Sequence, residues 1–151
     1  MNYGKVGEAA FTKYLRNNGY KYEDVSGNPE YWHRDIDFTL ESQIEEEKEI
    51  TVEVKSDSLI SKTGNFFIEF ENSHPNGGWY NFCEADYIAY YDINNKLFYI
   101  IDNEKLHDYI DDNEFRIQRR WCRCANEWSQ GYIIPTTTTS FVVAYINMEE
   151  R

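Results

Sequence analysis

The chain has 151 residues, of which 41% are hydrophobic and 17% are aromatic. This composition excludes a disordered chain, and we expect one folded domain over residues 1–151 with a core of its own. The formal net charge of −12 excludes a protein that coats nucleic acid or an anionic membrane through bulk positive charge, although it is compatible with a local basic groove.

The sequence also predicts the compartment. No apolar run approaches the roughly 20 residues that a bilayer span requires, so we expect no membrane partner. The N-terminal segment MNYGKVGEAAF has no apolar core of the secretory type. Three cysteines are too few for a disulfide framework, and they lack the spacing of a zinc site. We therefore expect a cytoplasmic protein.

The first half of the chain predicts a helix followed by three strands. An apolar stripe predicts a helix over residues 4–18, which ends at Gly19. Residues 20–34 contain turn signals and predict an irregular segment. Alternating apolar and polar residues predict strands over 35–40, 50–56 and 66–71, with a solvated acidic turn over 41–49.

The second half predicts a hairpin, a helix and a closing strand. The dipeptide Asn94-Asn95 is a hairpin signal, and residues 103–112 predict a short helix with Asn103 as its cap. The other segments are strands at 85–93 and 96–102, a helix or loop at 115–129, and a loop plus a strand at 132–146. This order predicts an α/β (mixed α+β) fold, in which helices flank a central mixed β-sheet.

Two neighbouring strands each carry a carboxylate among apolar residues. Asp37 lies in the strand over 35–40, and Glu53 lies in the strand over 50–56. If these strands pair in antiparallel fashion through the turn, the two carboxylates approach one another on one face. Adjacent carboxylates repel unless a cation lies between them, and hard oxygen ligands suit Mg²⁺ or Mn²⁺.

Two further side chains can reach the same place. Lys55 shares a face with Glu53, so its amine would lie beside the metal, where it could orient or help deprotonate a water, or neutralise charge developing on a phosphate. Glu8, early in the helix, lies at the edge of the apolar stripe and leans toward the sheet. Both residues also have structural interpretations, because alternating charges protect an edge strand and an early acid favours the helix dipole.

These segments together resemble the PD-(D/E)xK nuclease superfamily, which includes restriction endonucleases, Holliday-junction resolvases and small phage nucleases. The matching segments are GKVGE at 4–8, DIDF at 35–38 and VEVKSD at 52–57, and the resemblance extends to about residue 92. The proline of the family name is missing before Asp37, since the nearest upstream proline is Pro29.

The resemblance implies a restriction-endonuclease-like core with a defined site. It assigns catalysis to Asp37, Glu53, Lys55 and Glu8, and metal binding to Asp37, Glu53 and Glu8. The implied activity is a Mg²⁺- or Mn²⁺-dependent deoxyribonuclease, an endonuclease of phage, mobile-element, repair or recombination type. The implied substrate is duplex or branched DNA, and many relatives act as homodimers.

Substrate binding requires cations, and four arginines cluster in FRIQRRWCRC at 115–124. Arginines interleaved with aromatic residues can clamp phosphates and stack on bases, and Lys62 lies in the loop after the strand that carries Lys55. We expect nucleic-acid contacts from Lys62, Arg116, Arg119, Arg120 and Arg123. An alternative is that these arginines only balance the nearby acids between residues 108 and 114.

The net charge supports a different class of function. A small acidic protein can bind another protein as an inhibitor or a DNA mimic, and a chain with a nuclease fold can bind without catalysis. In such a binding module the carboxylates spread over a surface, whereas a nuclease requires them to converge. Divalent-metal binding therefore distinguishes the two classes.

Overall fold

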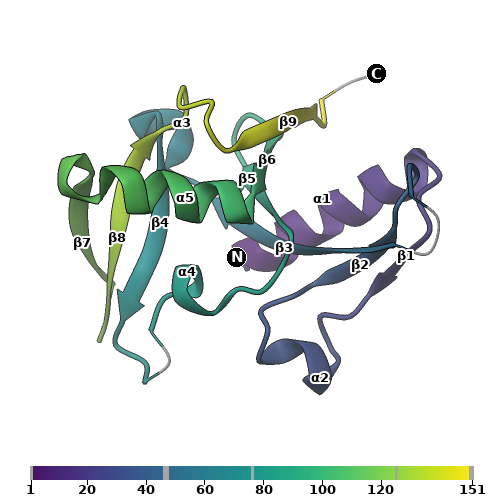
Figure 1. Cartoon of the computed structure of the whole chain (residues 1–151), viewed down its shortest axis with the longest axis horizontal. Coiled ribbons are helices and arrows are strands. Elements are labelled where there is room, and N and C mark those ends of the chain that lie inside the picture. The colour runs from purple at the N-terminus through teal and green to yellow at the C-terminus, as the bar shows by residue number, and fades with distance from the viewer. Residues whose placement is uncertain (1, 46–47, 76, 125, 150–151) are drawn as a thin grey trace.

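Two β-sheets and one long helix organise the computed structural model, which describes residues 2–45, 48–75, 77–124 and 126–149 (Figure 1). The elements in chain order are α1 (Tyr3–Asn17), β1 (Tyr22–Asp24), α2 (Pro29–Trp32), β2 (Phe38–Glu41), β3 (Glu49–Asp57), α3 (Ile60–Thr63), β4 (Asn65–Asn72), α4 (Trp79–Phe82), β5 (Tyr87–Asp92), β6 (Leu97–Asp102), α5 (Asn103–Asn113), the 3-10 helix η1 (Glu114–Arg116), β7 (Gln118–Cys124), β8 (Glu127–Pro135) and β9 (Val142–Asn147).

The larger sheet has six strands in the order β1-β2-β3-β5-β6-β9, and the smaller sheet has three in the order β4-β8-β7. Strands β3 and β5 run parallel, whereas the other described pairs are antiparallel. The connection from β3 to β5 is therefore a crossover, and it carries α3, β4 and α4. This mixed sheet with flanking helices confirms the predicted fold class.

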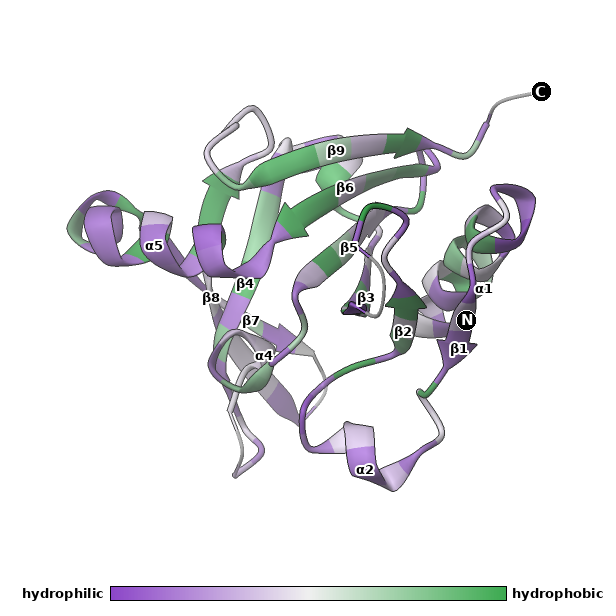
Figure 2. Ribbon diagram, turned by 45° about the vertical axis from the view of Figure 1, so that its right-hand side comes forward, coloured by the Kyte–Doolittle hydropathy of each residue, from purple (hydrophilic) through white to green (hydrophobic). Residues whose placement is uncertain are grey.

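Strand β5 is buried on both faces and separates two hydrophobic clusters. Ala89 and Tyr91 pack in the cluster that contains α1, while Ile88 and Tyr90 pack in the other. The second cluster contains side chains of β4, β8 and α5, so these elements cover the face of the larger sheet opposite α1. Figure 2 shows hydrophobic residues along β6 and β9; Phe98 and Ile101 of β6 are buried in the core, whereas β9 is largely exposed.

Helix α1 packs closely on β3. Phe11 and Leu15 are buried against the larger sheet. Gly7 is also buried, and a Cβ added there would meet Ser56 Oγ and lie 3.1 Å from Val54 Cγ1. No helix in the described ranges, α1 included, is long and apolar enough to cross a membrane.

We expect Gly7→Ala to lower the melting temperature, because the added methyl group crowds β3 and such overpacking costs about 1–3 kcal/mol. Gly4→Ala is the matched control on the same helix, where the new Cβ would have only Asn2 Oδ1 nearby at 3.4 Å. Alanine favours a helix over glycine by up to about 1 kcal/mol, so this control should keep or raise the melting temperature. Wild-type stability of Gly7→Ala would contradict the close packing of α1 on β3.

The expectation of a helix or loop over residues 115–129 is wrong. Residues Gln118–Cys124 form β7, which pairs with β8 at the edge of the smaller sheet. The side chains described for residues 118–123 are exposed on both faces, so the alternation that marks a half-buried strand is missing from the sequence. The start of the segment expected as a loop plus a strand belongs to β8.

Two smaller expectations are also corrected. Asp102, and not Asn103, caps α5, because its carboxylate accepts a hydrogen bond from the Lys105 backbone N–H at 3.1 Å. Asn103 is buried, and its amide donates to the backbone carbonyl of Cys83 at 3.1 Å. The segment 20–34, expected as irregular, contains the short elements β1 and α2.

Candidate active site

The pairing of β2 with β3 brings two acidic residues opposite one another. Phe38 pairs with Val52 in an antiparallel register, so the next residues outward, Asp37 and Glu53, face each other. The Asp37 backbone N–H donates to the Val52 carbonyl oxygen at 3.0 Å, and its Oδ2 accepts from the Val54 backbone N–H at 2.9 Å. The Asp37 carboxylate is thereby fixed beside β3.

Glu53 is a buried carboxylate, with only 4% of its surface exposed. Burial raises the pKa of Glu53 strongly, and hydrogen bonding to Asp35 and Asp37 raises it further. The Lys55 ammonium lowers the pKa of Glu53 but does not cancel these effects. The Glu53 carboxyl therefore holds its proton more tightly than an ordinary glutamate does, and a divalent cation can take the place of that proton.

Lys55 is the cation of this cluster. Its Nζ lies 3.6 Å from Asp35 Oδ2 and 5.7 Å from the centroid of the Trp79 ring. Burial lowers the pKa of Lys55, but the charges of Glu53 and Asp35 outweigh burial and raise it above its ordinary value. Lys55 therefore remains an ammonium at neutral pH, so it can offset negative charge but does not act as a base.

Glu8 approaches Asp37 from α1. Burial raises the pKa of this half-buried acid, and the charge of Asp37 raises it further, which places the two groups within interaction range. The close packing of α1 on β3 at the preceding residue, Gly7, accounts for this position. Asp37 thus interacts with both Glu8 and Glu53, although the three acids do not form a group whose ligand atoms all lie within 4.8 Å of one another. Oxygen donors of this kind are the ligands that a hard cation prefers.

Two residues of the site were missed by sequence reasoning. Asp35 has a left-handed backbone, with φ of 55°, in the turn before β2. Cys83 follows α4, is 7% exposed, and donates its S–H to the Asp35 backbone carbonyl at 3.4 Å. Burial raises the pKa of the Cys83 thiol to about 12. Asp35 shares the alternation of Asp37, which is a usable signal, whereas Cys83 lies 48 residues further along the chain without one.

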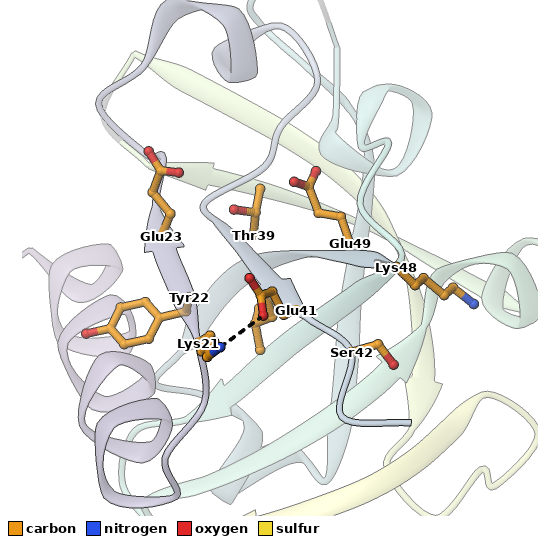
Figure 3. A pocket seen from close by; sticks show the side chains of 9 residues that line it. Lys21, Tyr22, Glu23, Thr39, Glu41, Ser42, Lys48 and Glu49 are labelled. Atoms are coloured by element: carbon orange, nitrogen blue, oxygen red, sulfur yellow. Dashed lines mark ion pairs between the residues drawn. The ribbon is translucent and has the colours of Figure 1, made fainter. Parts of the chain in front are cut away.

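One hollow of about 650 Å³ lies at the turn end of β2 and β3, beside β1 (Figure 3). Lys21 Nζ and Glu41 Oε2 form an ion pair there at 3.9 Å. Its charged lining consists of Glu23, Glu41, Glu49, Lys21 and Lys48. The acids outnumber the lysines in this hollow, and it contains none of the residues around Lys55, so it does not suit a phosphate.

A second hollow, of about 470 Å³, opens beside Lys55. The end of β3, α3 and β5 line one part of it, and β4, β7 and β8 of the smaller sheet line the rest. Lys55 and Arg120 contribute cations, Asp57 and Glu69 contribute acids, and Tyr3 and Trp79 contribute aromatic surfaces. A groove with these groups can hold a phosphodiester strand, and we call it the Lys55–Arg120 cleft.

Strand β7 divides the predicted arginine cluster between two faces. Arg120 lines the Lys55–Arg120 cleft, whereas its neighbour Arg119 forms an ion pair with Glu114 at 3.0 Å. The pairing of Arg119 agrees with the alternative in which the arginines balance nearby acids. The other predicted nucleic-acid contacts are exposed: Lys62, Arg116 and Arg123.

The fold has a counterpart among known structures. The mixed sheet with its flanking helices is a nuclease-like fold. The chain is similar to the structure of a bacterial homing endonuclease, I-Ssp6803I, with a TM-score of 0.50 and 15% sequence identity. The similarity covers 93% of this chain and 79% of the other. No protein-family model and no curated protein sequence matches the chain.

Proposed function

We propose that this chain is a Mg²⁺- or Mn²⁺-dependent nuclease that hydrolyses phosphodiester bonds of DNA, with a site of the PD-(D/E)xK type. The observation that carries the proposal is the convergence of Asp37, Glu53 and Lys55 at the paired strands β2 and β3, with Glu8 of α1 close to Asp37. Carboxylates of a binding module would spread over the surface, whereas Glu53 is buried. The similarity to a homing endonuclease adds support for DNA as the substrate.

Each residue has a defined task in this proposal. Asp37 is held by a backbone amide and presents an oxygen to the cation, as does Glu53 once it has lost its proton. A bound Mg²⁺ or Mn²⁺ would supply Lewis-acid chemistry, polarising the phosphate and acidifying a water. Lys55 stays charged, so it orients that water and stabilises the charge that develops on the phosphate. Glu8 completes the oxygen ligands.

The Lys55–Arg120 cleft supplies the proposed path of the scissile strand. Arg120 binds a phosphate next to the cleaved one, and Trp79 offers a face for a base. We assign weaker, peripheral phosphate contacts to Lys62, Arg116 and Arg123, because they are exposed and outside the cleft. Arg119 must first leave Glu114 to contribute.

Direct incubation with nucleic acid tests the proposal. The substrates are supercoiled plasmid, linear duplex, single strand and a four-way junction, each with Mg²⁺, Mn²⁺ or EDTA. We expect cleavage of at least one DNA substrate with either metal and none with EDTA. Cleavage that is equal in EDTA, or absent from every arm, would contradict the proposal, and the pattern among substrates separates plain duplex from branched DNA.

Metal binding is expected to stabilise the folded protein in the absence of DNA. A ligand present at 100 times its dissociation constant adds about 2.7 kcal/mol, which corresponds to a rise in melting temperature of several degrees. Asp37→Asn should remove most of this rise, because it removes a charged ligand while keeping the side-chain shape. Thermal unfolding with increasing Mn²⁺ measures the effect, and Asp108→Asn on the exposed side of α5 is the control. Equal shifts in both variants would contradict metal binding at Asp37.

A further inference from the structure

A thiol lies beside the carboxylates of the candidate active site. Possible ligand atoms of Asp35, Glu53 and Cys83 all lie within 4.8 Å of one another. Glu53 and Cys83 are buried, but the Asp35 side chain is 31% exposed and opens the group to solvent. Two carboxylates and a thiol form a mixed donor set, in which the sulfur favours a different class of cation from Mg²⁺.

We propose that Asp35, Glu53 and Cys83 form a binding site for a thiophilic divalent cation, Zn²⁺ or Cd²⁺, and that its occupation inhibits cleavage. The inhibitory part rests on the proposed nuclease function, whereas the binding part does not. Zinc–ligand bonds of about 2.0–2.3 Å place neighbouring ligand atoms about 3.5 Å apart in a tetrahedron. The three side chains therefore need to close by only about an ångström, and a water completes the tetrahedron.

Binding of Zn²⁺ or Cd²⁺ at this site releases the proton of the Cys83 thiol. The Cys83 S–H now donates to the Asp35 backbone carbonyl at 3.4 Å. Coordination requires the thiolate, so the thiol proton leaves to solvent, the hydrogen bond is lost and a sulfur–metal bond forms. No electron is transferred. Any proton on Glu53 is released in the same event.

The position of Lys55 explains why binding of Zn²⁺ or Cd²⁺ would inhibit cleavage. Lys55 Nζ lies 3.6 Å from Asp35 Oδ2, so the ammonium occupies the place that a divalent ion would take on Asp35. Zn²⁺ or Cd²⁺ at Asp35 repels Lys55 and withdraws Glu53 from its partnership with Asp37. The site therefore loses its positioned ammonium and one of its hard ligands together. Mg²⁺ prefers oxygen ligands and has no comparable reason to use Cys83.

Cadmium titration tests binding without any need for nuclease activity, because a Cd²⁺–thiolate bond gives a characteristic ultraviolet charge-transfer band. The titration uses a Cys122→Ser/Cys124→Ser background, so that Cys83 is the remaining cysteine. We expect a band that saturates at one equivalent of Cd²⁺ and disappears in the further variant Cys83→Ser. Absence of the band from the background protein, or its persistence in Cys83→Ser, would overturn the proposal.

A second ligand variant distinguishes a built site from a single reactive thiol. Asp35→Asn keeps a residue that tolerates the left-handed backbone and retains Cys83. We expect it to require at least about tenfold more Cd²⁺ for the same band, since even changes around metal ligands cost 10- to 100-fold in affinity. An unchanged titration would show that sulfur binds alone and would overturn the three-residue site. Cys83→Ala, with circular dichroism and melting curves for all variants, controls for unfolding at this buried position.

The inhibitory part is tested by cleavage in Mg²⁺ with added Zn²⁺ or Cd²⁺. Each variant is compared with its own rate in Mg²⁺ alone. We expect the background protein to lose cleavage at about one equivalent and Cys83→Ser to keep its own Mg²⁺ rate. A Cd²⁺ band without loss of cleavage would overturn the inhibitory part alone. Absence of Mg²⁺-dependent cleavage in all variants would overturn the nuclease function and the inhibition, while the band still decides the binding site.

Discussion

Glu53→Gln is expected to abolish cleavage and, at the same time, to stabilise the metal-free protein. Loss of one positioned electrostatic group typically costs at least about 10²-fold in rate, and Glu53 is also a proposed metal ligand. The glutamine keeps the shape of Glu53, and its amide can donate hydrogen bonds to Asp35 and Asp37. It therefore replaces a buried acid, surrounded by other acids, with a neutral donor.

The sign of the stability effect follows from the raised pKa of Glu53. The folded protein holds this proton more tightly than the unfolded chain, so stability decreases as pH rises above the ordinary glutamate pKa. Each pH unit above that value lowers the free energy of unfolding by up to about 1.4 kcal/mol, until the folded protein also loses the proton. In EDTA, the melting temperature of Glu53→Gln should exceed that of wild type by a margin that grows from pH 5 to pH 8.

The control for Glu53→Gln is Glu49→Gln, which is the same substitution at an exposed position of β3. We expect this control to change neither cleavage nor the pH dependence of melting. Initial rates on plasmid DNA and melting curves in EDTA measure both effects on the same preparations. If Glu53→Gln cut DNA at the wild-type rate, Glu53 would have no part in catalysis. If it melted lower at pH 8, Glu53 would not be a buried acid that favours its proton.

Lys55→Met is expected to lower cleavage by about 10²- to 10³-fold while leaving metal binding intact. Methionine keeps the length and the apolar stem of lysine but removes the ammonium that lies beside Asp35 and Trp79. The stabilisation by Mn²⁺ should persist or increase, because the carboxylates lose a competing positive charge. Lys55→Arg should not restore the rate, since a planar guanidinium does not reproduce a compact ammonium.

Kinetics and melting curves separate the two roles of Lys55. A loss of rate with an unchanged Mn²⁺ shift assigns Lys55 to catalysis, and Lys13→Met on exposed α1 serves as the charge-matched control. Loss of both cleavage and the Mn²⁺ shift would instead mean that Lys55 maintains the shape of the site. Retention of the wild-type rate by Lys55→Met would remove the proposed transition-state role.

The sequence predicted the convergence of Asp37 and Glu53 because it depends on local geometry. Two strands joined by a short turn have few possible registers, and alternation then fixes which residues share a face. Asp35 carries the same alternation, but its left-handed backbone, which brings its carboxylate to Lys55, has no signature in the sequence. Cys83 reaches the site through tertiary packing over a separation of 48 residues, which no periodic pattern encodes.

The smaller sheet shows a second limit of sequence patterns. The strand at 66–71 was predicted correctly, yet nothing in its alternation shows that it pairs with β8 and not with its neighbours in the chain. Strand β7 has no apolar face, so its arginines predicted a charged helix or loop equally well. The division of Arg119 and Arg120 between two faces follows only once that strand is known.

The parallel pairing of β3 with β5 separates the candidate site into early-forming and late-forming parts. Asp37, just before β2, and Glu53 on β3 belong to a local hairpin, which can close within microseconds. Trp79 and Cys83 belong to the crossover and arrive only when a long loop has been closed, which is slow for parallel strands. In a refolding chain, Asp37 and Glu53 would therefore come together before the Lys55–Arg120 cleft forms. The proposed cleavage activity should then return with the slowest folding phase.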